Sequence, residues 1–227
     1  MRSRTESRVA AICAIAGSVL LFAGTSLHPM GADPNEAVAA FTEYAADHGW
    51  IATHLMQLAG VALMLAALSF LTQELEAGPG RSAARIAAGG AIASLALAAA
   101  LQAVDGIALK SMVDAWARAP AAEKETALRA AFAVRQIEIG LASMSSLSFG
   151  LTATISGVAL LADQTYPKWF AVLAILGGGP TAIAGVVMAY TGFSGLTMAI
   201  NMPANLVLLL WMLALGALLW RRGGRLG

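Results

Sequence analysis

The sequence predicts an all-α integral membrane protein: a six-helix transmembrane bundle with extracytoplasmic helical extensions, formed by the whole chain (1–227) as a single membrane domain. Three observations favour this class. Hydrophobic residues make up 59% of the chain and charged residues 12%, with a mean hydropathy of +0.73, whereas soluble domains average about 45 to 50% apolar and 25% charged residues. The apolar residues fall into six long runs, and Lys and Arg gather on one side of these runs.

Each apolar run is long enough to cross a bilayer as a helix, which takes about 20 residues. Backbone polar groups find no water inside lipid, so we expect closed helices, and the alternating segments of about ten residues that are typical of a barrel are absent from the sequence. The predicted helices cover residues 9–27, 50–71, 85–119, 121–161, 169–190 and 203–220.

The first run also has a second interpretation, as a cleaved signal peptide. Arg2, Arg4 and Arg8 precede it, and the small residues Ala23-Gly24-Thr25 lie near its end. However, the run is longer than the usual signal core of about 7 to 15 residues, and the small residues do not form an A-x-A pattern. We therefore expect the first helix to be retained as a span.

The first outer loop predicts a short amphipathic helix over about 34–47. The segment Asp33-Pro34-Asn35-Glu36 has the pattern of a capping box, with proline at the first helical position. Helical spacing then gathers apolar side chains on one face, and we expect this helix to lie along the membrane surface. The residues of that face are Val38, Phe41, Tyr44 and Ala45.

The third and fourth helices are predicted to protrude as a helical hairpin that turns at Pro120. Residues 85–119 and 121–161 contain no breaker at the outer boundary, and at about 1.5 Å per residue they reach roughly 50 and 60 Å against a core of about 30 Å. Lys110, Asp114 and Arg118 form an i, i+4 ladder that we expect on the solvated side, so stability is the favoured role of the hairpin. Apolar residues should join its arms: Leu109, Met112, Val113 and Trp116 against Leu128, Ala131 and Phe132.

The fifth helix contains Gly177, Gly178, Gly179 and Pro180 near its centre, a pattern that predicts a kink or a short unwound stretch. Broken helices at this depth often line binding sites, but close helix packing is the commoner reason for such glycines. Small residues indicate close packing on two other helices as well: Gly89, Gly90, Ala93 and Ser94, and Ser145, Phe149, Thr152 and Ser156. The uncharged stretch 191–202 is open to two interpretations, a re-entrant segment or an outer lid.

The distribution of Lys and Arg predicts the orientation. Nine lie on the side of the termini and five on the other side, all five within the long middle loop, so the positive-inside rule places both termini in the cytoplasm. We therefore expect a multi-pass protein of the plasma (inner) membrane, surrounded by the lipid bilayer. Aromatic anchors agree: Trp50 and Tyr190 at the outer boundary, and Tyr166, Trp169 and Trp220 at the inner one.

Polar side chains of the helices then fall into one layer near the outer boundary. Ionisable groups in lipid are costly unless they face inward and pair, so we expect these groups to line one ligand pocket. Helical spacing places Gln102 with Asp105, and Arg135 with Glu138, on single faces. The predicted pocket residues are His54, Gln57, Gln102, Asp105, Arg135 and Glu138.

Two cofactors could use this layer. His28, His54, Asp105 and Glu138 are ligands of the type that zinc or another divalent metal accepts, although no HExxH-like spacing is present. Alternatively, His28 and His54 could bracket a haem iron if their helices are not in direct contact. The structural alternative is that Asp105 and Glu138 pair with Arg135, that His28 caps the first helix, and that His48 lies in water.

No sequence motif names a reaction. Cys13 is the single cysteine, and the net charge of +1 without a basic cluster argues against a nucleic-acid partner. We expect a non-enzymatic protein that binds, senses or carries a small-molecule ligand through an outward-facing polar pocket. The alternatives are a metal-dependent membrane hydrolase acting on a lipid-like substrate, and a structural or assembly subunit.

Overall fold

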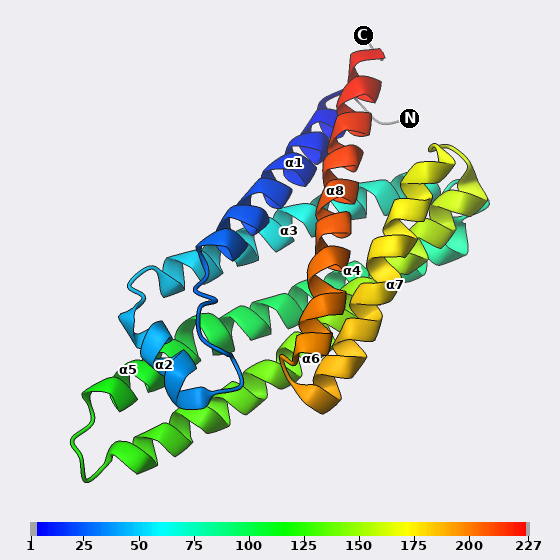
Figure 1. Cartoon of the computed structure of the whole chain (residues 1–227). Coiled ribbons are helices and arrows are strands. Elements are labelled where there is room, and N and C mark those ends of the chain that lie inside the picture. The colour runs from blue at the N-terminus through cyan, green and yellow to red at the C-terminus, as the bar shows by residue number, and fades with distance from the viewer. Residues whose placement is uncertain (1–3, 226–227) are drawn as a thin grey trace.

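The computed structural model describes residues 4–225, and all the elements that it describes are helical (Figure 1). Within these residues, six stretches are long and apolar enough to cross a membrane, as the sequence predicts: α1, α3, the run from α4 to α5, α6, α7 and α8. The elements are α1 (Arg4–Leu27), α2 (Ala37–Ala46), α3 (Trp50–Leu75), α4 (Arg81–Gln102), the π-helical segment η1 (Ala103–Leu109), α5 (Lys110–Arg118), α6 (Lys124–Asp163), α7 (Lys168–Thr191) and α8 (Gly195–Arg225).

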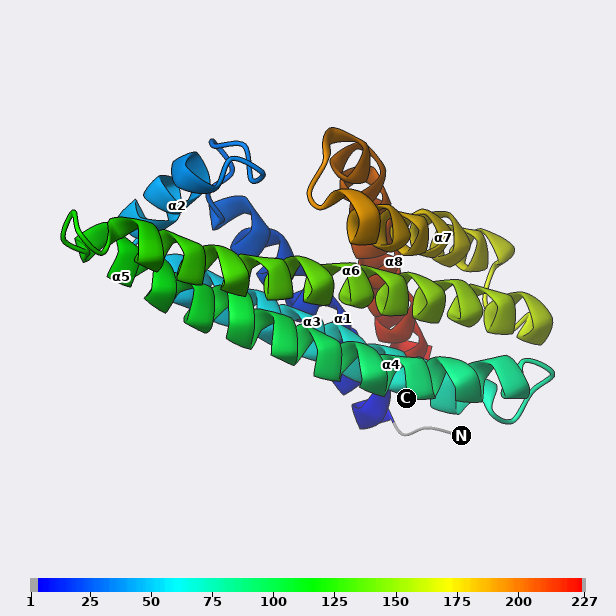
Figure 2. The same cartoon turned by 90° about the horizontal axis from the view of Figure 1, so that it is seen from below.

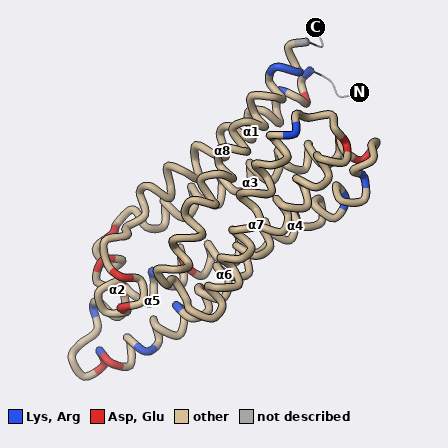
Figure 3. The backbone as a smooth tube through the Cα atoms, turned by 45° about the vertical axis from the view of Figure 1, so that its right-hand side comes forward, with Lys and Arg blue, Asp and Glu red and all other residues tan. Residues whose placement is uncertain are grey.

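The six long helices form a ring in chain order. Each packs on the next, and α8 returns to pack on α1 and closes the ring. The described ends of the chain, residues 4 and 225, lie together at one end of the bundle, which we call the termini end (Figure 1). The opposite end, the α2 end, holds α2, the start of α3 and the turn between α5 and α6. Charged residues gather at these two ends and leave an uncharged middle (Figure 3).

Small residues bring neighbouring helices into backbone contact. A Cβ atom added at Gly60 on α3 would lie 2.8 Å from the carbonyl oxygen of Gly17 on α1, and one added at Gly185 on α7 would lie 2.7 Å from that of Ser143 on α6. The hydroxyl of Ser94 on α4 lies 2.9 Å from that of Ser148 on α6. Such contacts stabilise helix pairs where no water drives them together. The packing role predicted for the small-residue faces thus applies here.

Gly177 and Gly178 of α7 pack closely on neighbouring helices, Gly179 does not, and the helix runs through all three without interruption. A Cβ at Gly177 would lie 2.8 Å from the side chain of Leu208 on α8, and one at Gly178 would lie 2.6 Å from the carbonyl oxygen of Gly150 on α6. The hydroxyl of Thr181 donates to the carbonyl of Gly177 at 2.8 Å, which supports the backbone beside Pro180. Of the two expected outcomes, a kink or a short unwound stretch, the unwound stretch does not form, since α7 stays helical where Gly177 and Gly178 contact α8 and α6.

The predicted helical hairpin is present. The run from α4 to α5 spans 38 residues and α6 spans 40 residues, and the two lie side by side along their length (Figure 2). Met112 and Phe132 are exposed instead of packing between the arms. A second apolar core joins α2, the start of α3 and the hairpin: Ala40, Phe41, Tyr44, Trp50, Leu109, Val113, Trp116 and Ala131.

Lys110 was predicted to lie on the solvated side of the hairpin, but it is only 7% exposed. Its Nζ donates to the carbonyl oxygens of Tyr44 and Ala45, at 2.9 and 3.2 Å, and to Asp114 Oδ1 at 2.8 Å. The lysine therefore supplies hydrogen bonds to the last carbonyls of α2, where a cation is favoured by the helix dipole. This contact fixes α2 against the hairpin.

The α2 helix begins at Ala37, three residues later than predicted. Asp33 Oδ1 accepts a hydrogen bond from the backbone N–H of Asn35, and Glu36 makes no side-chain cap, so the expected capping box is replaced by a local turn. Phe41 and Tyr44 are buried against the hairpin, whereas Val38 is exposed. The apolar face of α2 is thus covered by protein instead of lying on a membrane surface.

The α8 helix begins at Gly195, and Pro203 lies inside it. Ser194 Oγ accepts a hydrogen bond from the backbone N–H of Thr197 at 3.2 Å, an N-cap contact. Gly192 has a positive φ of 61° and ends α7. Most of 191–202 is therefore the first turns of α8, and neither of the two expected interpretations describes it.

Candidate functional site

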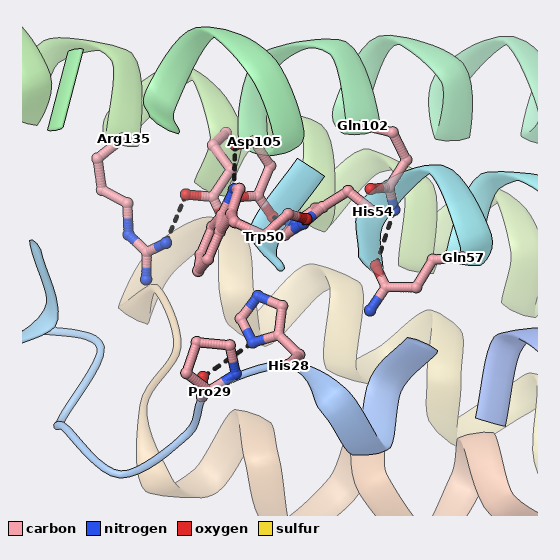
Figure 4. A network of polar contacts seen from close by, with 9 residues as sticks. His28, Pro29, Trp50, His54, Gln57, Gln102, Asp105 and Arg135 are labelled. Carbon is pink, nitrogen blue, oxygen red and sulfur yellow. Dashed lines mark hydrogen bonds and ion pairs between the residues drawn. The ribbon is translucent and has the colours of Figure 1, made fainter. Parts of the chain in front are cut away.

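Four helices and the segment after α1 bring polar side chains together at the α2 end (Figure 4). The six predicted pocket residues lie in this region as three pairs: His54 with Asp105, Gln57 with Gln102, and Arg135 with Glu138. His28, predicted as a metal ligand, joins the first pair. We call His28, His54 and Asp105 the His/Asp cluster.

The π-helical segment η1 carries Asp105 and Gly106 to α3. π-Helical turns insert one extra residue into a helix and are frequent at functional sites. A Cβ atom added at Gly106 would lie 2.6 Å from the Cβ of His54, so only glycine allows this close approach. The result is that Asp105, whose side chain is 14% exposed, reaches His54 across the helix interface.

His54 is buried on α3, with 1% of its surface exposed. Its Nδ1 lies 2.7 Å from the backbone oxygen of Trp50. Because a carbonyl oxygen only accepts, Nδ1 must carry the proton, and the Nε2 of a neutral ring is then a bare lone pair. This Nε2 lies 3.0 Å from Asp105 Oδ2, the distance of an ion pair if the ring carries a second proton. Two acceptors at this distance repel each other unless a cation, either a proton or a metal ion, lies between them.

His28 follows the end of α1 and presents the same arrangement. Its Nδ1 donates to the backbone oxygen of Pro29 at 2.9 Å, which leaves Nε2 as the lone pair. Burial lowers the pKa of His28 below the usual 6.5, and the nearby Asp105 carboxylate opposes this shift. A lowered pKa favours the neutral ring, the form that binds metals.

Aromatic rings hold the two imidazoles. The Trp50 ring lies 4.7 Å from that of His28, 4.6 Å from that of His54 and 4.4 Å from that of Tyr44, measured between centroids. Its Nε1 donates to the backbone oxygen of Asp105 at 3.0 Å. Trp50 is only 1% exposed, so it is a buried positioning residue and not the boundary anchor that the sequence suggested.

The His/Asp cluster has the composition of a metal site. One nitrogen from each histidine and one carboxylate oxygen lie within 4.8 Å of one another. Glu138, the fourth predicted ligand, does not belong to this group in the described part of the chain. Its carboxylate instead accepts a hydrogen bond from Arg135 Nη1 at 2.5 Å within α6, which gives it a different partner.

The structural alternative expected Asp105 to pair with Arg135. This ion pair does not form, because Asp105 faces His54. The guanidinium donates to the backbone oxygen of Pro34 at 3.3 Å and lies 4.9 Å from the ring of Phe193. It thus joins the loop after α1 and the loop before α8 to α6. The pair of Arg135 and Glu138 lies within α6.

Gln57 and Gln102 lie toward the middle of the bundle. Gln102 Nε2 donates to Gln57 Oε1 at 3.2 Å, and the buried Gln102 Oε1 has no hydrogen-bond partner. His48 is exposed at the turn before α3, as expected. A hollow of about 470 Å³ lies against α6 and α7, lined by residues that include Gln136, Gly140 and Ala189. It does not include the predicted pocket residues.

A haem does not fit between the histidines. Their ring centroids are 5.1 Å apart, and both rings contact the Trp50 ring in tilted arrangements. A porphyrin would have to displace Trp50 and separate α3 from the end of α1. The sequence reasoning missed Trp50 and Gly106 as parts of the site, although each has a local signal: Trp50 precedes His54 by one helical turn, and Gly106 follows Asp105.

Comparisons with known proteins do not add to this description. No family model matches the chain, and neither the curated proteins nor the solved structures contain a match. The functional argument therefore rests on the geometry of the site.

Proposed function

We propose that this chain is a multi-pass protein of the plasma (inner) membrane, with both termini in the cytoplasm, that binds a small cationic ligand at the α2 end of its bundle. Six apolar helices support the membrane assignment. The excess of Lys and Arg at the termini end supports the orientation, since positive residues favour the cytoplasmic side. In this orientation the α2 end faces outward, and α2 and the tip of the hairpin around Pro120 lie outside the membrane.

Exposed aromatic residues agree with this placement. Tyr190, near the α2 end, is 86% exposed, and Trp169 and Trp220, near the termini end, are about half exposed. Such rings favour the two membrane interfaces. Tyr166 does not serve as an anchor: it is buried, and its hydroxyl donates to Glu74 at 2.5 Å.

One observation carries the ligand proposal: two histidines and an aspartate from three separate parts of the fold converge, with one nitrogen from each histidine and one carboxylate oxygen within 4.8 Å of one another. His54 Nε2 and Asp105 Oδ1 are buried without a hydrogen-bond partner. Buried polar atoms without partners are rare and costly, so such atoms indicate a function. Lone pairs and a carboxylate attract cations, which defines the charge of the ligand.

The proposal is tested by ligand-induced stabilisation, because a ligand that binds only the folded state raises its stability. Purified protein in lipid nanodiscs is heated with a panel of monovalent cations, organic amines and divalent cations. We expect one class to raise the melting temperature of the wild type and of His48→Gln, whose exposed histidine is the matched control, but not that of His54→Gln. If no member of the panel shifts the wild type, or if the two variants respond equally, the proposal is wrong.

A further inference from the structure

The nature of the ligand follows from the donor atoms. Resting on the proposed function, we infer that the cation is a divalent transition-metal ion of the zinc type, held by His28 Nε2, His54 Nε2 and the Asp105 carboxylate. Imidazole and carboxylate together suit zinc and its neighbours in the first transition row, whereas calcium and magnesium take oxygen ligands and soft copper(I) takes sulfur. These three donors come from the segment after α1, from α3 and from η1.

The hydrogen bonds that the two histidines make through Nδ1 agree with metal binding through Nε2. Both rings donate their Nδ1 hydrogen to a backbone carbonyl, His28 to Pro29 and His54 to Trp50. Metal-binding histidines almost always donate their other ring N–H in this way, which fixes the tautomer and aims the lone pair at the ion. Here the carbonyl bonds select the same nitrogen, Nε2, on both rings, and the adjacent Trp50 ring restricts their rotation.

The distances allow one ion to reach all three donors. Zinc binds nitrogen and carboxylate oxygen at about 2.0 to 2.2 Å, which places tetrahedral ligand atoms about 3.4 Å apart. His54 Nε2 and Asp105 Oδ2 are already 3.0 Å apart. One nitrogen from each histidine and one carboxylate oxygen lie within 4.8 Å of one another, so these separations have to close by at most about 1.4 Å to reach tetrahedral spacing. The half-buried His28 side chain, which follows the end of α1, can supply this movement more easily than the fully buried His54.

The metal also removes the conflict between His54 and Asp105. In the neutral tautomer, the Nε2 lone pair faces a carboxylate oxygen, and a dication between them turns this repulsion into two bonds. Asp105 Oδ1, buried without a partner, remains available as a second carboxylate contact. A proton on His54 would satisfy the same pair, so the two explanations have to be separated by measuring the metal itself.

A site with three protein ligands can release and rebind its metal ion. Structural zinc sites are closed by four protein ligands, whereas sites with three keep a position for water or substrate. We therefore expect a chelator to remove the ion without unfolding the protein. A hydrolytic reaction on a lipid-like substrate would use the same position, with the metal-bound water as nucleophile.

The test uses full-length protein without a polyhistidine tag, purified in nanodiscs and stripped with a chelator. Zn²⁺ is titrated and counted, and Co²⁺ supplies visible absorption bands that report ligand geometry. We expect one ion per chain in the wild type. The affinity for Zn²⁺ should fall by more than about 100-fold in His28→Gln, His54→Gln and Asp105→Asn. Even substitutions of residues that only hydrogen-bond to a metal ligand typically weaken metal binding 10- to 100-fold. The control variants His48→Gln and Glu125→Gln, which change exposed side chains, should bind as the wild type does.

X-ray absorption of the Zn²⁺-loaded wild type gives a readout that does not depend on the folding of any variant. Two imidazole ligands and at least one oxygen ligand are expected, and a single imidazole, or sulfur, would overturn the assignment. Equal losses in His48→Gln and His54→Gln would also overturn it. If Zn²⁺ and Co²⁺ do not bind but an organic amine stabilises the protein through His54, the metal inference falls and the proposed function stands. If no cation binds, both fall.

Discussion

Replacement of Gly106 by alanine tests whether the close contact between η1 and α3 builds the site. The added Cβ atom would lie 2.6 Å from His54 Cβ and 3.0 Å from His54 Cγ. These atoms are fixed close to the α3 backbone, so the contact is relieved only if η1 and α3 move apart. Gly89 on α4 is the matched control, because nothing lies within 4 Å of a Cβ added there.

The two substitutions share one effect and differ in another. Alanine favours a helix over glycine by about 0.8 to 1.0 kcal/mol, so Gly89→Ala should raise the free energy of unfolding by up to about 1 kcal/mol. Gly106→Ala receives the same gain but also overpacks a buried contact, which typically costs about 1 to 3 kcal/mol. The difference between the free energies of unfolding of the two variants, about 1 to 3 kcal/mol, is then the cost of overpacking the contact between η1 and α3.

Unfolding by dodecyl sulfate in mixed micelles, followed by tryptophan fluorescence, measures both free energies. Zn²⁺ titration of the same samples should show weaker binding only in Gly106→Ala, because the variant separates His54 from Asp105. If Gly106→Ala is as stable as Gly89→Ala and binds Zn²⁺ like the wild type, the η1 contact does not position the site.

Other features make independent predictions. Lys110→Met should lower the free energy of unfolding by about 1.5 to 3 kcal/mol and speed amide exchange in α2, because it removes hydrogen bonds from a charged donor; unchanged exchange would contradict the capping role. Glu138→Gln should lower the free energy of unfolding by about 3 to 5 kcal/mol in the same assay, since the buried guanidinium of Arg135 loses its counter-charge. Burial raises the pKa of Tyr44 to about 12. The change in ultraviolet absorption that marks ionisation of Tyr44 should therefore come near pH 12 and be absent from Tyr44→Phe. Because the tyrosine of the unfolded chain ionises near pH 10, the free energy of unfolding should fall between about pH 10 and 12. A reporter fused after Trp220 should be active only in the cytoplasm, and one inserted at Pro120 only outside; the reverse would place the site on the cytoplasmic side.

The helices were predictable because their signal is local. An apolar run of about 20 residues is sufficient for a span, and the six runs of the sequence became the six long helices. The start of α8 was missed although most residues of its first two turns are apolar, and Pro203, a residue that favours the first position of a helix, lies inside it. The cap by Ser194 and Thr197 is a local signal that could have found it.

Burial at the α2 end was not predictable from local patterns. The spacing of Lys110 and Asp114 predicts their ion pair, and this pair forms. It does not predict that the C-terminus of α2 folds onto the same lysine, because that contact joins residues more than sixty positions apart. For the same reason Trp50 was expected at a membrane boundary, although the second core buries it.

The candidate site was predictable as a layer but not as a set of pairs. Depth in the bundle follows from position along a helix, so His54, Asp105 and Glu138 were expected at one level. The partner of Asp105 depends on how its helix is rotated about its axis, and the π-helical segment η1, with the close contact at Gly106, brings it to His54. Sequence periodicity at 3.6 residues per turn does not describe a π-helical turn. The pairing of Asp105 with His54 could therefore come only from the structure.

The central claim, a metal ion between His28, His54 and Asp105, is tested most directly by anomalous X-ray scattering from crystals of the Zn²⁺-loaded protein. The difference map at the zinc edge should show a peak about 2.0 to 2.2 Å from both Nε2 atoms and from an Asp105 oxygen. A peak at His48 instead, or a zinc-soaked crystal in which His54 and Asp105 contact each other directly with no peak between them, would contradict the claim.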